Sequence, residues 1–163
     1  MGDFENLDQL RSQIKDNLKK EKEMKAKDKV RMEILENLAQ DSEVEVPEVL
    51  IEAETEKMMN KLKDDLSRAG LSFEDYLKKI DKEEEKVKEE MRSESEKRSR
   101  FGLIINKISK DEQITPTEEE INSELEKLLS QYQDADKDQA RNYVVNNLIN
   151  EKTLTFLENQ IEK

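Results

Sequence analysis

Apolar residues recur every three or four positions along almost the whole chain, and very little interrupts them. This spacing places successive apolar side chains on one face of an α-helix. The 163 residues include only three Gly and two Pro, the residues that most often end a helix. Strand-like alternation is confined to residues 44–46, which is too short a stretch to found a sheet. The sequence therefore predicts an all-α fold.

The predicted helices have thin apolar faces. Only 33% of the residues are hydrophobic and 43% are charged, whereas about 25% is the usual charged share. We therefore expect an elongated domain whose helices carry one apolar stripe and several solvated faces. The net charge of −12 disfavours nucleic acids and anionic membranes as partners, because both require positive surface. No apolar run approaches the roughly 20 residues of a membrane span.

About six helices are expected, and the first should run from about Asn6 to about Leu38. Its two apolar ends are separated by an almost purely polar stretch over residues 19–27. We expect that stretch to bridge solvent between two packing regions. The apolar residues at helical spacing in the two regions are Leu7, Leu10, Ile14 and Leu18, then Val30, Ile34, Leu35 and Leu38.

Breaks in the pattern mark the following helices. Pro47 should occupy the first position of the second helix, where its missing N–H costs nothing, and Gly70 should end that helix as a left-handed cap. A capping box from Ser72 to Asp75 predicts the start of a short third helix.

A long fourth helix should run from about Lys82 to about Lys110, roughly 40 Å. Its second half is apolar on more than one face. Thr115 should cap the fifth helix, with Pro116 first and Glu118 completing the capping box. A sixth helix follows the polar turn at residues 133–136.

Residues that commonly carry chemistry are scarce. The chain has no Cys and no His, which removes thiolate chemistry and the commonest general base and metal ligand. The acidic runs at 83–85 and 118–120 are better explained as helix starts, because consecutive helical residues do not face one another. Asp134, Asp136 and Asp138 have calcium-loop spacing, but Val145 stands at the twelfth place, which requires Glu. We predict no catalytic residues, metal or cofactor.

Five segments resemble the C-terminal domain of the bacterial trigger factor family, in the family's order. The clearest are the hydrophobic-Pro-Glu-x-Leu helix start at Pro47 and the Pro-Thr-x-Glu-Glu-Ile start at Pro116. The five segments are residues 4–11, 44–54, 72–77, 98–105 and 114–121. Together they cover nearly the whole chain.

The resemblance implies a helical body with projecting arms, a fold similar to the chaperone domain of periplasmic SurA-type proteins. We expect one domain over residues 1–163, with a long N-terminal helix (1–42), a first arm and long hinge helix (43–110), and a second arm with the C-terminal helix (111–163). The family's ribosome-binding motif and its FKBP-like prolyl isomerase domain are not recognised here. We therefore expect an excised domain that is not itself an enzyme, although the family is one of peptidyl-prolyl isomerases.

The function implied is that of an ATP-independent chaperone domain, which cradles unfolded or nascent polypeptides through dispersed apolar patches. A cytoplasmic location is expected, with ribosome contact only through the missing N-terminal domain and with possible self-association through exposed apolar surface. The candidate client-binding residues are apolar residues of the second, fourth and fifth helices: Met58, Met59, Leu62, Met91, Phe101, Leu103, Ile105, Ile121, Leu125 and Leu128.

Several alternatives stay open from the sequence alone. The apolar end of the fourth helix suits core packing as well as client binding. The aromatic residues Phe4, Phe73, Tyr76 and Tyr132 are either client anchors or staples that fix helix entry. The basic run from Lys19 to Arg31 suits a solvated helix face better than ribosomal RNA, because acidic residues interleave it. The rival function is a helical adaptor that binds one folded partner.

Overall fold

The computed structural model describes residues 7–132 and 134–161, which form six α-helices and no strand. The helices are α1 (Leu7–Asp41), α2 (Glu48–Arg68), α3 (Phe73–Ile80), α4 (Glu84–Asp111), α5 (Glu118–Gln131) and α6 (Lys137–Ile161). The prediction of an all-α fold with about six helices is confirmed. None of the helices in these residues is long and apolar enough to cross a membrane.

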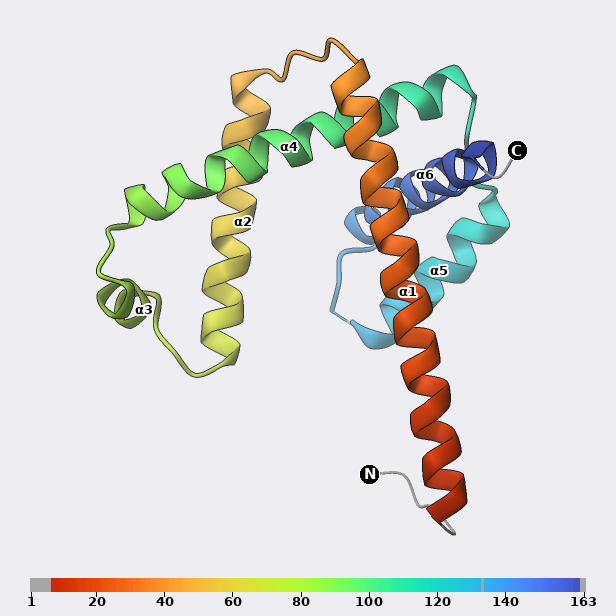
Figure 1. Cartoon of the computed structure of the whole chain (residues 1–163), viewed down its shortest axis with the longest axis horizontal. Helices are drawn as coiled ribbons and strands as arrows, with labels where there is room; N and C mark the ends of the chain where they lie inside the picture. The colour runs from red at the N-terminus through yellow and green to blue at the C-terminus, as the bar shows by residue number, and fades with distance from the viewer. Residues whose placement is uncertain (1–6, 133, 162–163) are drawn as a thin grey trace.

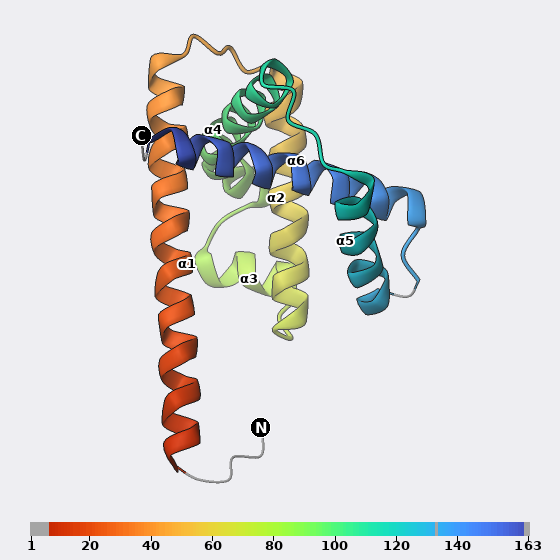
Figure 2. The same cartoon turned by 90° about the vertical axis from the view of Figure 1, so that its right-hand side faces the viewer.

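The helices form an elongated frame with α4 as its central strut (Figure 1). One half of α4 packs on α2, and α3 folds back beside α2 to complete a first arm. The other half of α4 meets α1 and α6, while α5 packs on α6 to form a second arm (Figure 2). The two arms lie toward opposite ends of the strut (Figure 1).

The buried apolar residues are few, and one cluster of them lies where α1, α4 and α6 meet. Leu35 of α1 packs there against Phe101 and Ile105 of α4, and the half-buried Ala39 and Leu154 close the cluster. The apolar end of α4 therefore forms the core of the frame. This small core agrees with the low hydrophobic content of the sequence.

The second and third helices show how the sequence sets helix ends. Gly70 adopts φ +73° just after α2, and the N–H of Leu71 reaches back to the carbonyl of Leu66 at 2.9 Å. This is the left-handed cap that the sequence predicts. The Ser72 hydroxyl oxygen accepts the N–H of Asp75 at 3.1 Å, so the predicted cap of α3 also forms.

Two predicted helix starts were displaced. Pro47 lies one position earlier than expected, as the extended N-cap of α2, and its carbonyl accepts the N–H of Leu50 at 2.9 Å. Val46 has no side-chain oxygen that could cap an earlier start. The fifth helix is capped by Thr117 rather than Thr115, in a reciprocal box with Glu120.

The choice between the two threonines follows from packing, because both have a Glu three residues later. Starting at Thr117 lets Glu120 accept the N–H of Thr117 at 2.7 Å and the ammonium of Lys152 on α6 at 2.5 Å. The box therefore also ties α5 to α6.

The prediction of two packing regions on the first helix is wrong for the N-terminal one. Only the C-terminal part of α1 has buried residues, namely Arg31, Ile34 and Leu35. The N-terminal half projects past the rest of the frame in both views (Figures 1 and 2). Its apolar residues therefore face solvent within the described part of the chain.

Candidate functional site

The second arm carries an apolar groove between α5 and α6. Near the turn that joins the helices, a hollow of about 720 Å³ is lined by Leu128, Tyr132, Ala135 and Tyr143, among others. A neighbouring hollow of about 510 Å³ shares Leu128 and Tyr143 and continues along α6 past Leu148. We call these two hollows together the α5–α6 groove. Because both are open to solvent, an extended chain can lie along them.

Two tyrosines are the exposed large hydrophobic residues of this groove. Tyr132, which ends α5, is 61% exposed, and Tyr143 on α6 is 59% exposed. Tyrosine offers a large apolar ring with a polar tip, and it contacts varied partners at little cost in conformational entropy. Of the two interpretations left open for Tyr132, its exposure favours an anchor for client chains over a staple that fixes helix entry.

The rim of the α5–α6 groove is mostly acidic. Glu124, Asp134 and Glu151 line it, while Lys127 is its one lysine and lies 2.5 Å from the Glu124 carboxylate. Asp136 accepts the N–H of Gln139 at 2.9 Å and so caps α6. The described residues contain no group of three or more acidic side chains placed to hold a metal ion.

Four of the predicted binding residues lie on the first arm, between α2 and α4. Met59 is buried, with 1% of its surface exposed, while Met58, Leu62 and Met91 are half-buried. The Ser95 hydroxyl, fully buried, donates to the carbonyl of Met91 at 3.0 Å and lies 3.4 Å from the Met58 sulfur. The predicted residues of this arm therefore line the seam that holds α2 on α4.

The remaining predicted residues divide between the core and the second arm. Phe101 and Ile105 belong to the core cluster, and Leu103 is half-buried on the same helix. Ile121 is buried at the start of α5, whereas Leu125 and Leu128 are half-buried. The structure brings only Leu128 of the ten into the α5–α6 groove.

The other predicted aromatics behave differently. Phe73 and Tyr76 stack on one another on α3 with ring centroids 6.3 Å apart, and the Lys63 ammonium of α2 lies 4.7 Å from the Phe73 ring centre. This pair fixes α3 against α2, as expected of staples. Phe4 lies outside the described residues.

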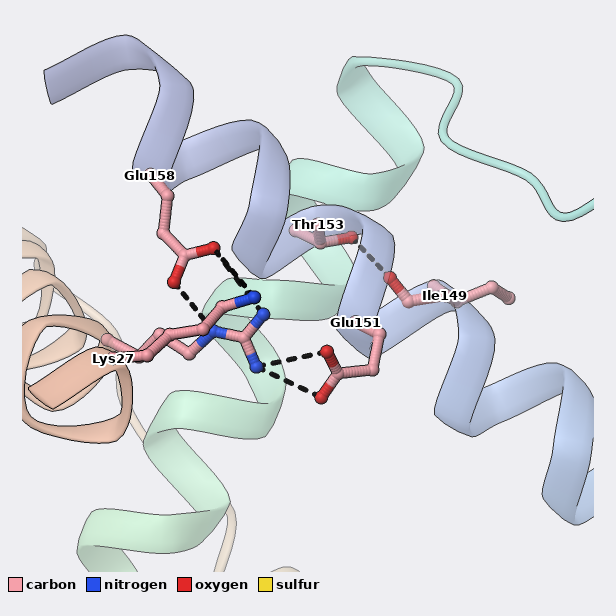
Figure 3. Close-up of polar contacts among 6 residues, drawn as sticks. Lys27, Ile149, Glu151, Thr153 and Glu158 are labelled. Atoms are coloured by element: carbon pink, nitrogen blue, oxygen red, sulfur yellow. Dashed lines mark hydrogen bonds and ion pairs between the residues drawn. The ribbon is translucent and has the colours of Figure 1, made fainter. Parts of the chain in front are cut away.

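An ion-pair cluster around the buried Arg31, which no local sequence pattern predicts, fastens α1 to α6 (Figure 3). The Arg31 guanidinium donates to both Glu151 oxygens at 3.0 Å, and through Nε to Glu158 at 2.9 Å. The Lys27 ammonium lies 3.7 Å from the same Glu158 carboxylate. We call these four residues the Arg31 clamp.

The clamp keeps its arginine charged. Burial lowers the pKa of Arg31, but hydrogen bonds to Glu158 and Glu151 outweigh it and raise that pKa above its ordinary value. Arg31 lies three and four residues before Ile34 and Leu35, so it shares their buried face. This position before two buried apolar residues is the sequence feature that could have predicted the burial of Arg31.

The rest of the basic run is a solvated helix face. Apart from the Lys27–Glu158 contact of the clamp, its ion pairs are within α1, such as Lys25 with Glu21 at 2.6 Å and Lys29 with Glu33 at 3.7 Å. Pairs at this spacing on an exposed helix add only a few tenths of a kcal/mol each, about 0.2–0.5. The interpretation of this run as solvated agrees with the structure for every residue except Arg31.

Comparison with known proteins gives a family. The family described as "Bacterial trigger factor protein (TF) C-terminus" matches residues 6–161. The trigger factor of Clostridium botulinum (strain Hall) is 34% identical over 165 residues, which cover 96% of this chain and 38% of that protein. The trigger factor of Halothermothrix orenii is 37% identical over 127 residues, which cover 78% of this chain and 30% of that protein.

A third relative, the trigger factor of Bacillus cytotoxicus, is 35% identical over 126 residues, or 77% of this chain and 30% of that protein. No solved structure matches the chain. The chain thus spans less than two fifths of the length of these relatives. With a match to the family over nearly all of its length and the helical frame described above, this chain belongs to the bacterial trigger factor family, as its C-terminal domain.

Proposed function

We propose that this domain is an ATP-independent chaperone module that holds unfolded polypeptides through separated apolar patches. The observation that carries the proposal is the α5–α6 groove, an open apolar channel with Leu128, Tyr132 and Tyr143 accessible along it. An unfolded chain exposes apolar segments that a folded protein hides. A solvent-open groove without a closed pocket suits segments of varied sequence.

The size of the groove sets the strength of binding. Covering its two tyrosines and Leu128 removes roughly 300 Å² of apolar surface from water, or about 7 kcal/mol before losses. Association itself costs at least about 4 kcal/mol, so a single segment is held weakly and reversibly. Several patches that engage one long chain together raise its apparent affinity.

The half-buried residues Met58, Leu62 and Met91 of the first arm, with Leu103 and Leu125, are proposed as further contacts. Met suits this role because its flexible side chain repacks around varied partners. The buried residues of the predicted set are proposed to hold these contact residues in position. They are Met59, Phe101, Ile105 and Ile121.

The test is the suppression of aggregation of a chemically denatured client, measured by light scattering. The domain is expected to suppress aggregation at a several-fold excess, and the double variant Leu128→Ser/Tyr143→Ser should raise the concentration needed by about tenfold. Val49→Ser is the matched control, because Val49 is exposed on α2 and lies outside the groove. Failure of the unmodified domain to suppress aggregation would remove the proposal.

The same assay separates the chaperone from the helical adaptor. A chaperone should bind several unrelated unfolded clients with low affinity, whereas an adaptor should form one stoichiometric complex with a folded partner. The cytoplasmic location and ribosome contact through another domain are proposals that rest on the family. We also expect no isomerisation of a proline peptide by this domain, measured with a chromogenic substrate.

A further inference from the structure

The N-terminal half of α1 presents a second apolar surface, which is separate from the α5–α6 groove. Leu7, Ile14 and Leu18 are 72%, 49% and 51% exposed. Together with the half-buried Leu10 they form one line along the helix, which we call the α1 stripe. Both views show this part of α1 standing apart from the other described helices (Figures 1 and 2).

The α1 stripe is not a continuation of the face that docks on α4 and α6. Each helical residue turns by about 100°, so the centre of the stripe lies about 110° around the helix from the buried Arg31, Ile34 and Leu35 face. The stripe is therefore a separate surface from the docked face, and none of the other described helices covers it.

The charge around the stripe is opposite to that of the chain. Residues 7–30 contain eight basic and five acidic residues, a net charge of +3, whereas the whole chain carries −12. Arg11, Lys15 and Lys22 lie along one edge of the stripe, within about 100° of its centre. Neither Lys15 nor Lys22 has an ion-pair partner among the described residues.

A second copy joined stripe to stripe is a poor occupant. Two such surfaces together would bury roughly 600 Å², below the about 1,000 Å² expected of a specific interface. The two cationic edges would also repel each other. The stripe therefore suits a ligand that brings its own negative charge and needs only weak, reversible binding.

We propose that the α1 stripe is a second client site, which takes apolar segments of unfolded chains that are flanked by Asp or Glu. This inference rests on the proposed chaperone function and assigns a substrate class to it. Lys127 and Arg31 offset Glu124 and Glu151 on the rim of the α5–α6 groove, but Asp134 and Asp136 leave that rim net negative, so it disfavours such segments. The two patches thus divide client segments by the charge beside their apolar residues.

The test uses two synthetic peptides with the same central Leu and Phe residues, one flanked by Glu and one by Lys. Methyl NMR of the domain locates each peptide, and fluorescence anisotropy measures its Kd. The Glu peptide should shift the methyl groups of Leu10, Ile14 and Leu18. Lys15→Glu/Lys22→Glu should weaken its binding about fivefold, because two surface charge contacts become repulsive. High salt should weaken it as well.

The matched control is Lys19→Glu/Lys20→Glu, which makes the same change in net charge on the same helix but more than about 100° from the stripe. It should change the Kd of the Glu peptide less than about twofold. Equal losses for the two double variants, or shifts of the Glu peptide confined to Leu128, Val144 and Leu148, would overturn the inference. Sedimentation that shows a dimer joined through the α1 stripe would do so too.

The outcome separates this inference from the proposed function. An acidic client that is protected from aggregation equally well by the unmodified domain and by Lys15→Glu/Lys22→Glu would overturn the inference and leave the chaperone function standing. A Glu peptide bound at the stripe, without protection of any client, would remove the function and leave the stripe as a peptide site.

Discussion

Replacing Arg31 by Met should release α1 from the frame more strongly than the loss of any exposed ion pair. The guanidinium makes four hydrogen bonds to two carboxylates, and these differ in burial. The Glu158 side chain is 17% exposed, so losing Arg31 leaves a poorly solvated carboxylate with only Lys27, 3.7 Å away. The Glu151 side chain is 62% exposed and water can replace its partner.

These exposures set the magnitude. The Glu151 half of the clamp should contribute about 0.2–1 kcal/mol, as surface pairs do. The Glu158 half should contribute about 1–3 kcal/mol, the cost of leaving a buried charged acceptor without its donor. Arg31→Met should therefore lower the free energy of unfolding by about 1–4 kcal/mol, a large part of the about 5–15 kcal/mol typical of a domain.

The assay is urea unfolding followed by far-ultraviolet circular dichroism, with hydrogen exchange of the α1 amides as a local measure. Arg141→Met is the matched control, because Arg141 also donates twice to one carboxylate, that of Glu118, at 2.8 and 2.9 Å on an exposed surface. It should cost at most about 1 kcal/mol. In Arg31→Met/Glu158→Leu the stranded carboxylate is removed, so about half of the lost stability should return. Equal costs for the two single variants would refute the argument from burial.

Two further predictions concern helix ends. The pKa of Glu120 is lowered from 4.5 by the hydrogen bond from Lys152 and then by that from the Thr117 backbone, so the carboxylate stabilises the fold above pH 4.5 and this contribution is lost as the pH falls through its pKa in the folded domain. The melting temperature of Glu120→Gln should therefore fall less steeply between pH 6 and 3 than that of the unmodified domain. Parallel curves of melting temperature against pH would contradict this prediction. Gly70→Ala should lower the free energy of unfolding by about 1 kcal/mol, measured by thermal unfolding. The cost is backbone strain alone, because Gly70 has φ +73° and a Cβ there would meet nothing within 4 Å. An unchanged melting temperature would count against the left-handed cap.

The helices themselves could be predicted from the sequence because their apolar period is local information. Gly70 and Ser72 end and start helices through contacts with residues at most five positions away, so they too were predicted. The start of α5 was misplaced because Thr115 and Thr117 both have Glu three residues on. The contact that decides between them, Lys152 on Glu120, comes from 32 residues away.

The binding surfaces were harder to predict for a different reason. An apolar stripe that faces a core and one that faces solvent have the same spacing, so Leu7 and Ile14 looked like Ile34 and Leu35. The Arg31 clamp joins residues 120 and 127 positions apart, and no local pattern reports such a pair. Tyr143, which lines the α5–α6 groove, is not among the ten client-binding residues predicted from the sequence.

The small core has a consequence for how the two arms are held. Several contacts between helices are ion pairs at half-exposed positions, such as Lys63 with Glu84 at 2.9 Å and Lys97 with Glu36 at 2.5 Å. Such pairs fix which residues face each other but add little free energy, about 0–1 kcal/mol each. The frame should therefore be firm at the Leu35–Phe101–Ile105 cluster and more easily deformed toward the ends of the arms. A groove near the end of a deformable arm can adjust to segments of different shape, which a groove in a dense core cannot do.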